Sequence, residues 1–321
     1  MMQSDISVVI PTKNNATTIA LTLDSLGIQR FPADWEIIVV DDGCVDGTLD
    51  VVRGHDLFCQ QRIRIVRNPR AGLAAAYNIG CTESRFPLLI LMHGDCYVTS
   101  PTAAADMVLC FADSSVVGAM SIVTVPSDLW ERMSFWDRVS NARYLGLESH
   151  GFGGKFDAIR KEALQKIGGF DEMHFFSAGE DYDMVIRLGA VGKLAKTGVK
   201  VTHDHQHPPR RSFVSLLRKQ GQLGEGLGAL LRTHGCNRIY VDLVIAQGTK
   251  MVLFAGLLVP VARWGALFLL AVLSLAYSWR AFLQKDMRVL LIPFANLLQF
   301  AVLACAVMTG YLRGRQRFRY K

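Results

Sequence analysis

Paired cysteines and an N-terminal hydrophobic leader are both missing from this sequence. The chain of 321 residues contains seven cysteines, an odd number, with no C-x-x-C spacing. Free thiols of this kind are typical of a reducing compartment, and no zinc site built on paired cysteines is expected. The first strand-like run, ISVVI at residues 6–10, is shorter than the apolar part of a signal peptide. We therefore expect the N-terminal region to stay in the cytosol.

Charge is nearly absent from two stretches close to the C-terminus. Between residues 251 and 279 the only charged side chain is Arg263, and between 289 and 312 there is none. A helix needs about 20 apolar residues to cross a hydrocarbon core. We predict a transmembrane region over 249–312 with two helices, at about 251–279 and 289–312. A separate third helix, at about 242–262, is the alternative.

The positive charge of the chain is concentrated behind the second apolar stretch. The formal net charge is +7, and the tail YLRGRQRFRYK has five basic residues among eleven. A basic run directly after an apolar helix is typical of a cytoplasmic tail beside anionic lipids, so no nucleic-acid partner is expected. Two membrane helices return this tail, residues 313–321, to the cytosol, whereas three would place it outside. The sequence therefore favours two helices in a multi-pass protein of the cytoplasmic membrane.

Short β-branched runs alternate with helix-like stretches over the first two hundred residues. The runs are ISVVI, EIIVV, IRIV, LLILM and VVGAMSIV. Runs that are apolar on both faces indicate strands buried in a parallel or mixed sheet. This pattern predicts an α/β domain over 1–209, with ligands outside the carboxyl ends of its strands. Residues 210–248 are amphipathic, which predicts interfacial linker helices or, equally, an ordinary surface helix packed on the sheet.

Polar side chains follow three of the predicted strands. Two adjacent aspartates in VVDDGCVDGT repel one another, so they form a solvated turn or hold a ligand. A carboxylate just past a central strand, as in HGD at 93–95, can bind a divalent cation whose other ligands are diphosphate oxygens, although such triplets are common in turns. The candidate site residues at these strand ends are Pro11 and the polar residues Thr12, Asn14, Asp41, Asp42, His93 and Asp95.

Two further stretches contain residues suited to proton transfer or metal binding. GEDYDMVIRLGAVGK predicts a helix that begins near Glu180 and Asp181, where an acid can serve as a general base or simply cap the helix. In VTHDHQHPPRR, His203, His205 and His207 alternate along the chain. These imidazoles are possible ligands for Mn²⁺ or Zn²⁺, and a polar loop is the alternative.

In order and number these motifs resemble glycosyltransferase family 2, inverting enzymes of GT-A fold that take sugars from nucleotide diphosphates. The resemblance runs from about residue 6 to 205 through VVIPTKNN, VVDDGCVDGT, NPRAGLAAAYNIG, HGD, IGGFDE and GEDYDMVIRL. It implies a mixed, mainly parallel sheet flanked by helices and followed by C-terminal transmembrane helices. It also implies transfer of a sugar to a hydroxyl or phosphate of a lipid-linked or glycan acceptor at the membrane.

The resemblance assigns roles to individual residues. Asp181 would be the catalytic base, with Glu180 beside it supporting acceptor or donor hydroxyls. Asp95 would bind the Mn²⁺ or Mg²⁺ that bridges the diphosphate, and His203 would contact the same ion. The implied nucleotide-binding residues are Pro11, Thr12, Asn14, Asp41, Asp42, Arg70, Gly72, Asn78 and His93.

Departures from the family pattern, and motifs that are missing, refine this hypothesis. His93 stands where the family has the first aspartate of its metal motif, which favours Mn²⁺ because Mn²⁺ tolerates nitrogen ligands better than Mg²⁺ does. Cys44 and Val45 replace the usual serine and threonine.

The Q-x-x-R-W signature of processive synthases is missing, so single-sugar transfer is favoured. The alternatives are a nucleotidyltransferase, which would need a glycine-rich phosphate loop, and a non-catalytic membrane scaffold with a degenerate metal site.

Overall fold

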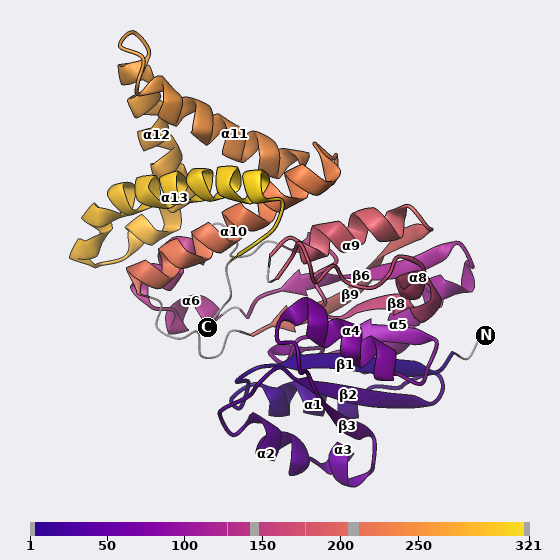
Figure 1. The fold of residues 1–321 in the computed structure, drawn as a ribbon. Coiled ribbons are helices and arrows are strands. Elements are labelled where there is room, and N and C mark those ends of the chain that lie inside the picture. The colour runs from indigo at the N-terminus through magenta and orange to yellow at the C-terminus, as the bar shows by residue number, and fades with distance from the viewer. Residues whose placement is uncertain (1–3, 127, 142–147, 177, 205–211, 318–321) are drawn as a thin grey trace. The chain divides into compact units, whose positions relative to one another are not determined.

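The computed structural model of the chain contains two compact units (Figure 1). The structure describes residues 4–126, 128–141, 148–176, 178–204 and 212–317. The α/β unit comprises residues 1–129, 146–172 and 180–206. The helical unit comprises residues 130–145, 173–179 and 207–321, so it takes two segments from within the range predicted as the first domain.

The described residues of the α/β unit form one nine-stranded sheet in the order β3-β2-β1-β4-β8-β6-β9-β5, with β7 beside β6. Strands β1 to β4 run parallel to one another, as do β6 and β9, and the other neighbours are antiparallel. The predicted mixed sheet is confirmed. The strands are β1 (Ile6–Thr12), β2 (Trp35–Asp41), β3 (Ile63–Arg67), β4 (Leu88–Leu91), β5 (Cys96–Tyr97), β6 (Val116–Thr124), β7 (Ser149–His150), β8 (Asp157–Arg160) and β9 (Lys193–His203).

Helices cover both faces of this sheet because its central strands are apolar on both sides. One core joins Val8 and Val39 to α1 (Ile19–Gly27), α2 (Thr48–Arg53), α3 (Asp56–Cys59) and α5 (Ala103–Leu109), which is followed by a 3-10 turn at Cys110–Ala112. The other joins Val9 and Ile38 to α4 (Leu73–Glu83), α8 (Lys161–Lys166) and α9 (Glu180–Gly189). Helix α4 lies against the strands at Gly80, where a Cβ would be 2.3 Å from a methyl carbon of Val9.

The helical unit is built around the pair α10 (Phe213–His234) and α13 (Ile292–Arg313). A Cβ added at Gly224, Gly228 or Gly310 would lie 2.1–2.6 Å from backbone oxygens of the facing helix, so only glycine allows this approach. Small residues four apart are typical of closely packed membrane helices. The apolar side of the predicted amphipathic segment therefore packs on α13. The other helices are α6 (Leu129–Arg132), α7 (Phe135–Asn141), α11 (Val241–Gly256) and α12 (Arg263–Tyr277), with 3-10 turns at Trp279–Leu283 and Met287–Leu291.

Among the described residues, one helix is long and apolar enough to cross a membrane: the 27 residues Met287–Arg313, which include α13. This helix contains the predicted span 289–312. The prediction of a continuous helix over 251–279 is wrong, because α11 ends at Gly256 and α12 begins at Arg263. Pro260 lies in the connecting turn, and a proline ring is incompatible with a helix interior.

Candidate active site

The polar clusters predicted at the strand ends lie at one edge of the sheet. Strands β1, β2 and β4 are parallel neighbours, so their carboxyl ends point to the same side. The N–H of Asp42 donates to the carbonyl oxygen of Thr12 at 2.9 Å, which joins the residues after β2 to the end of β1. The prediction that these clusters share one edge is confirmed by this register.

The turn after β2 is held by side chains of two predicted nucleotide-binding residues. Asp41 Oδ1 accepts the N–H groups of Gly43 at 3.0 Å and Cys44 at 2.8 Å. Asn14 Oδ1 accepts the N–H of Val45 at 2.9 Å from a backbone with φ 57°, a conformation that asparagine tolerates. The backbone N–H groups at Cys44 and Val45 are therefore satisfied even though both residues lack the hydroxyl usual at these positions.

Asp42 links the end of β2 to the loop before α4. Its Oδ1 accepts hydrogen bonds from Asn68 Nδ2 at 2.6 Å and from the N–H of Gly72 at 2.8 Å. Gly72 has φ 110°, which favours glycine at this close approach. Lys13 Nζ lies 3.9 Å from the other carboxylate oxygen. Asp42 thus fixes the position of the loop before α4 and also presents a carboxylate at the carboxyl edge of the sheet.

Two other predicted nucleotide-binding residues, Arg70 and Asn78, meet around Glu172. Arg70 forms an ion pair with Glu172 at 3.0 Å, and Asn78 Nδ2 donates to the same carboxylate at 2.7 Å. The Asn78 amide also exchanges hydrogen bonds with the backbone of Phe170. Both residues line a cavity of about 370 Å³ beside α8. The Asn78 amide is therefore engaged with the loop after α8, and its nucleotide contact stays a prediction.

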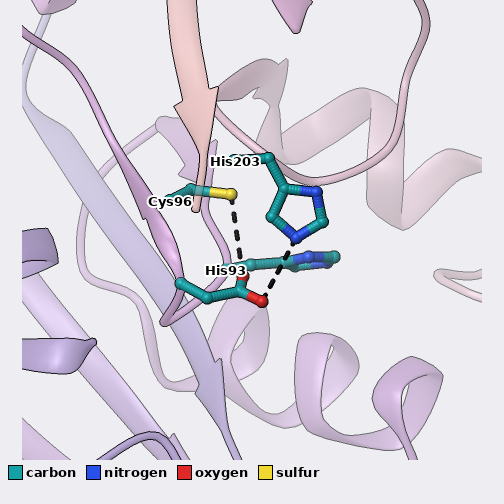
Figure 2. Close-up of side chains that lie close together, drawn as sticks. His93, Cys96 and His203 are labelled. Atoms are coloured by element: carbon teal, nitrogen blue, oxygen red, sulfur yellow. Dashed lines mark hydrogen bonds and ion pairs between the residues drawn. The ribbon is translucent and has the colours of Figure 1, made fainter. Parts of the chain in front are cut away.

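Four side chains converge on one point beyond the end of β4. One potential ligand atom from each of His93, Asp95, Cys96 and His203 lies within 4.8 Å of the other three (Figure 2). His203 Nε2 is 3.2 Å from Asp95 Oδ2, and the Cys96 thiol is 3.8 Å from Asp95 Oδ1. The rings of His93 and His203 meet edge to face, with centroids 6.2 Å apart. We call these four residues the His93–His203 cluster.

The pairing of β5 with β9 creates this cluster. Cys96 stands opposite His203 in the antiparallel register, which brings the end of β9 to the HGD turn. One carboxylate, two imidazoles and a thiol are a donor set that fits a single divalent cation. Burial holds the pKa of the Cys96 thiol well above its usual range, with the Asp95 charge as a second cause. His205 and His207 lie outside the described residues.

The sequence predicted Asp95 and His203 as metal ligands and placed His93 among the nucleotide contacts; these roles stay predictions. Sequence reasoning missed Cys96, although this residue directly follows Asp95. The strand pairing that brings Cys96 to His203 was not predicted, because β5 has only two residues.

The acids at the start of α9 occupy two different environments. Glu180, Asp181 and Asp183 all lie in the first turn, where the partial positive charge of the helix end stabilises carboxylates. Asp183 is 1% exposed and forms an ion pair with Arg187, which also donates to two backbone carbonyls. Asp181 is partly exposed and accepts the N–H of Tyr182 at 2.9 Å. Asp183 is therefore a structural acid, whereas Glu180 and Asp181 are both partly exposed.

A buried aspartate that sequence reasoning did not single out shapes the loop before β8. Asp157 accepts the N–H groups of Ser121, Gly153 and Gly154 at 2.8–3.0 Å. Burial nevertheless raises the pKa of this carboxyl group. The Tyr77 hydroxyl donates to the carbonyl of Gly154 at 2.9 Å, which ties the same loop to α4.

Comparison with known proteins identifies the family of the chain. The model of the family described as Glycosyl transferase family 2 matches residues 7–168, which is half of the sequence. The chain belongs to glycosyltransferase family 2. Membership in this family makes the protein a glycosyltransferase and gives no support to the nucleotidyltransferase and scaffold alternatives.

Two proteins whose names state a biosynthetic or transferase role are similar in sequence to this glycosyltransferase. Glycosyltransferase AglE of Haloferax volcanii is 24% identical over 235 residues, which cover 69% of this chain and 72% of AglE. Succinoglycan biosynthesis protein ExoA of Rhizobium meliloti is 27% identical over 197 residues, and the match spans 58% of each chain.

One solved structure covers nearly all of the glycosyltransferase. The mannosyltransferase PcManGT from Pyrobaculum calidifontis, in complex with GDP-Man and Mn²⁺, aligns with a TM-score of 0.63 and 20% identity. The alignment covers 97% of this chain and 88% of PcManGT. At this identity the likeness establishes the GT-A fold.

Proposed function

We propose that this glycosyltransferase moves a single sugar from a nucleotide-diphosphate sugar to a hydroxyl or phosphate of a membrane-associated acceptor, with inversion at the anomeric carbon. The observation that supports this most directly is the His93–His203 cluster beyond the end of β4, at the edge where the strand-end polar residues gather. A cation at this place would lie where ligands of open α/β sheets bind.

The four residues of the His93–His203 cluster would hold the divalent cation. When bound, this ion supplies positive charge that stabilises the departing nucleoside diphosphate. Two imidazoles and a thiol alongside one carboxylate favour Mn²⁺ over Mg²⁺, because Mg²⁺ prefers oxygen ligands. The strand-end residues Thr12, Asp41 and Asp42 are the proposed contacts to the nucleoside.

Asp181 is the proposed general base. Its carboxylate takes the proton of the acceptor hydroxyl while the hydroxyl oxygen bonds to the anomeric carbon and the nucleoside diphosphate leaves. No protein nucleophile takes part, so a single displacement inverts the anomeric configuration. Glu180, the preceding residue of the same helical turn, is proposed to hold hydroxyl groups of the acceptor or donor.

We place the acceptor at the cytoplasmic membrane and the α/β unit on its cytosolic side. The helix Met287–Arg313 is one proposed membrane-spanning element, and a second crossing before it in the sequence would keep the basic tail in the cytosol. The turn between α11 and α12 and the start of α12 support membrane contact, because Leu258, Val261 and Trp264 are 75–95% exposed there. Exposed aliphatic and tryptophan side chains are favoured at the bilayer interface. An anchored enzyme meets lipid-linked acceptors at a raised effective concentration.

A thermal-shift panel of UDP-, GDP- and dTDP-sugars, with and without Mn²⁺, tests the donor and metal assignments on the full-length protein. At a hundredfold excess over Kd a ligand adds about 2.7 kcal/mol of stability. For a domain of this size that raises Tm by roughly 5–10 °C. We expect one nucleotide class to produce such a shift, and to do so only with Mn²⁺ present.

Asp95→Asn and Asp50→Asn form a matched pair for this experiment. Asp50 is an exposed aspartate on α2 that pairs with Arg53 and belongs to none of the proposed site groups. Asp95→Asn should abolish the part of the shift that depends on Mn²⁺, whereas Asp50→Asn should keep it. An unchanged Mn²⁺ dependence in Asp95→Asn would contradict the metal assignment.

A further inference from the structure

A cavity of about 540 Å³ lies within the helical unit at the C-terminal ends of α10 and α13. Arg232, Arg313, Arg315 and His174 line it, and the described lining residues include no aspartate or glutamate. Arg232 lies in the last turn of α10 and Arg313 in the last turn of α13. Because the two helices pack in parallel, their ends bring arginines from distant parts of the sequence to one place.

The walls of this arginine cavity are fixed by hydrogen bonds and packing. Gln316 is 7% exposed, and its N–H donates to the carbonyl of His174 at 2.9 Å. Its side-chain amide accepts the N–H of Phe176 at 2.9 Å and donates to the carbonyl of Gln222 at 3.0 Å. The Arg232 guanidinium lies over the ring of Tyr311, 5.8 Å from the ring centroid.

The charge around the arginine cavity is positive after its acidic neighbour is counted. Glu225 pairs with Arg313 at 3.3 Å and also accepts the N–H of Arg317 at 2.8 Å. The ends of α10 and α13 each contribute about half a negative charge. Among the described residues, the charge of the three arginines exceeds the combined charge of one glutamate and two helix ends. The cavity is therefore suited to an anion.

We propose that the arginine cavity binds the phosphate group of an anionic lipid. The cavity lies where the apolar sequence of α13 gives way to the basic residues after Leu312, which is the polar boundary of the proposed membrane helix. Guanidinium groups donate two parallel hydrogen bonds to a phosphate, which makes arginine well suited to this ligand. The inference rests on the membrane placement proposed above but is independent of sugar transfer.

Binding of three probes to the full-length protein in a neutral detergent tests this inference. The probes are farnesyl phosphate, a short-chain phosphatidic acid and inorganic phosphate, which represent a polyprenyl phosphate, a phospholipid headgroup and a free anion. We expect at least one lipid phosphate to bind ten times more tightly than inorganic phosphate. The preferred lipid probe identifies the source of the phosphate, and equal affinity for all three probes would overturn the assignment to a lipid.

Two double variants separate a built site from general positive charge. Arg232→Gln with Arg315→Gln removes two arginines of the cavity. Arg218→Gln with Arg238→Gln removes two exposed arginines of the same unit that do not line it. We expect the cavity variant to lose tenfold or more in affinity for the lipid phosphate and the control to stay within twofold.

Equal losses in both double variants would refute the arginine cavity as the binding site. If the double cavity variant does not fold, Arg315→Gln alone, beyond the end of α13, replaces it. Alkaline extraction of membranes tests the membrane placement separately, so loss of lipid-phosphate binding and failure of membrane insertion give different results. Nucleotide-sugar binding, measured as above, should be unchanged in every one of these variants.

Discussion

Exchanging each of two aspartates on α9 for asparagine separates catalysis from stability within one helical turn. Asp181→Asn and Asp183→Asn both remove one carboxylate and keep the shape of the side chain. We expect Asp181→Asn to lower kcat by 10²–10⁴, the usual contribution of a general base. The change in the free energy of unfolding should stay within about 0.5 kcal/mol, which is usual for substitutions at partly exposed positions that have no buried partner.

The opposite result is expected for Asp183→Asn because of its surroundings. Asp183 is 1% exposed and accepts two hydrogen bonds from Arg187, one of them at 2.9 Å. A hydrogen bond to a charged group contributes about 1.5–3 kcal/mol, and an asparagine oxygen can still accept one of them. We therefore expect Asp183→Asn to lower the free energy of unfolding by about 2 kcal/mol, which lowers Tm by roughly 4–8 °C. Arg187 keeps its bonds to Ile167 and Gly169, which limits the loss.

Thermal unfolding and single-turnover transfer, measured on both variants, give the two readouts. Activity per folded molecule of Asp183→Asn should stay within a few fold of the natural protein. The reasoning is refuted if Asp181→Asn keeps its turnover with a hydroxyl acceptor, because the base then lies elsewhere. Retained turnover with a phosphate acceptor has a different meaning, since that acceptor has no hydroxyl proton to lose.

Two further predictions concern thiol reactivity and helix packing. Burial raises the pKa of the Cys81 thiol to about 12, so only about one thiol in ten thousand is ionised at pH 8. Mass spectrometry after mild alkylation should find exposed Cys59 modified and Cys81 intact until the protein unfolds, and early labelling of Cys81 would contradict this. Gly228→Ala should destabilise the helical unit by about 1–3 kcal/mol, since its Cβ would lie 2.1 Å from a backbone oxygen. Gly248→Ala, with no atom within 4 Å of its Cβ, should be neutral or stabilising in the same thermal unfolding assay, and equal effects would contradict the packing argument.

The sheet and its polar edge were predictable because their signals are local. Each buried parallel strand is a short apolar run, and the residues that follow it must emerge at the carboxyl edge. Asp41, Asp42 and Asp95 could therefore be placed at that edge from the sequence alone. The apolar run at 289–312 likewise predicted a helix through its length and its lack of charge.

Other features depend on contacts between distant segments and could not be predicted. Cys96 joins the cluster only because β5 pairs with β9, more than one hundred residues later in the chain. The engagement of Asn78 with Phe170 and Glu172 has no signal in its own motif. The interruption of the 251–279 run did have a local signal, Pro260, but the apolar composition on both sides of it favoured one helix.

The composition of the His93–His203 cluster predicts that metal binding and nucleotide binding depend on each other. With His93 in place of the usual acid, the cluster has one carboxylate, and burial raises the pKa of the Cys96 thiol well above its usual range. Such a set holds a divalent cation less strongly than two carboxylates do, because less negative charge opposes the charge of the ion. In the proposed complex, the diphosphate of the donor would supply the missing negative oxygens. Metal and nucleotide sugar are therefore expected to raise each other's affinity by the same factor, since coupling between two binding equilibria is reciprocal.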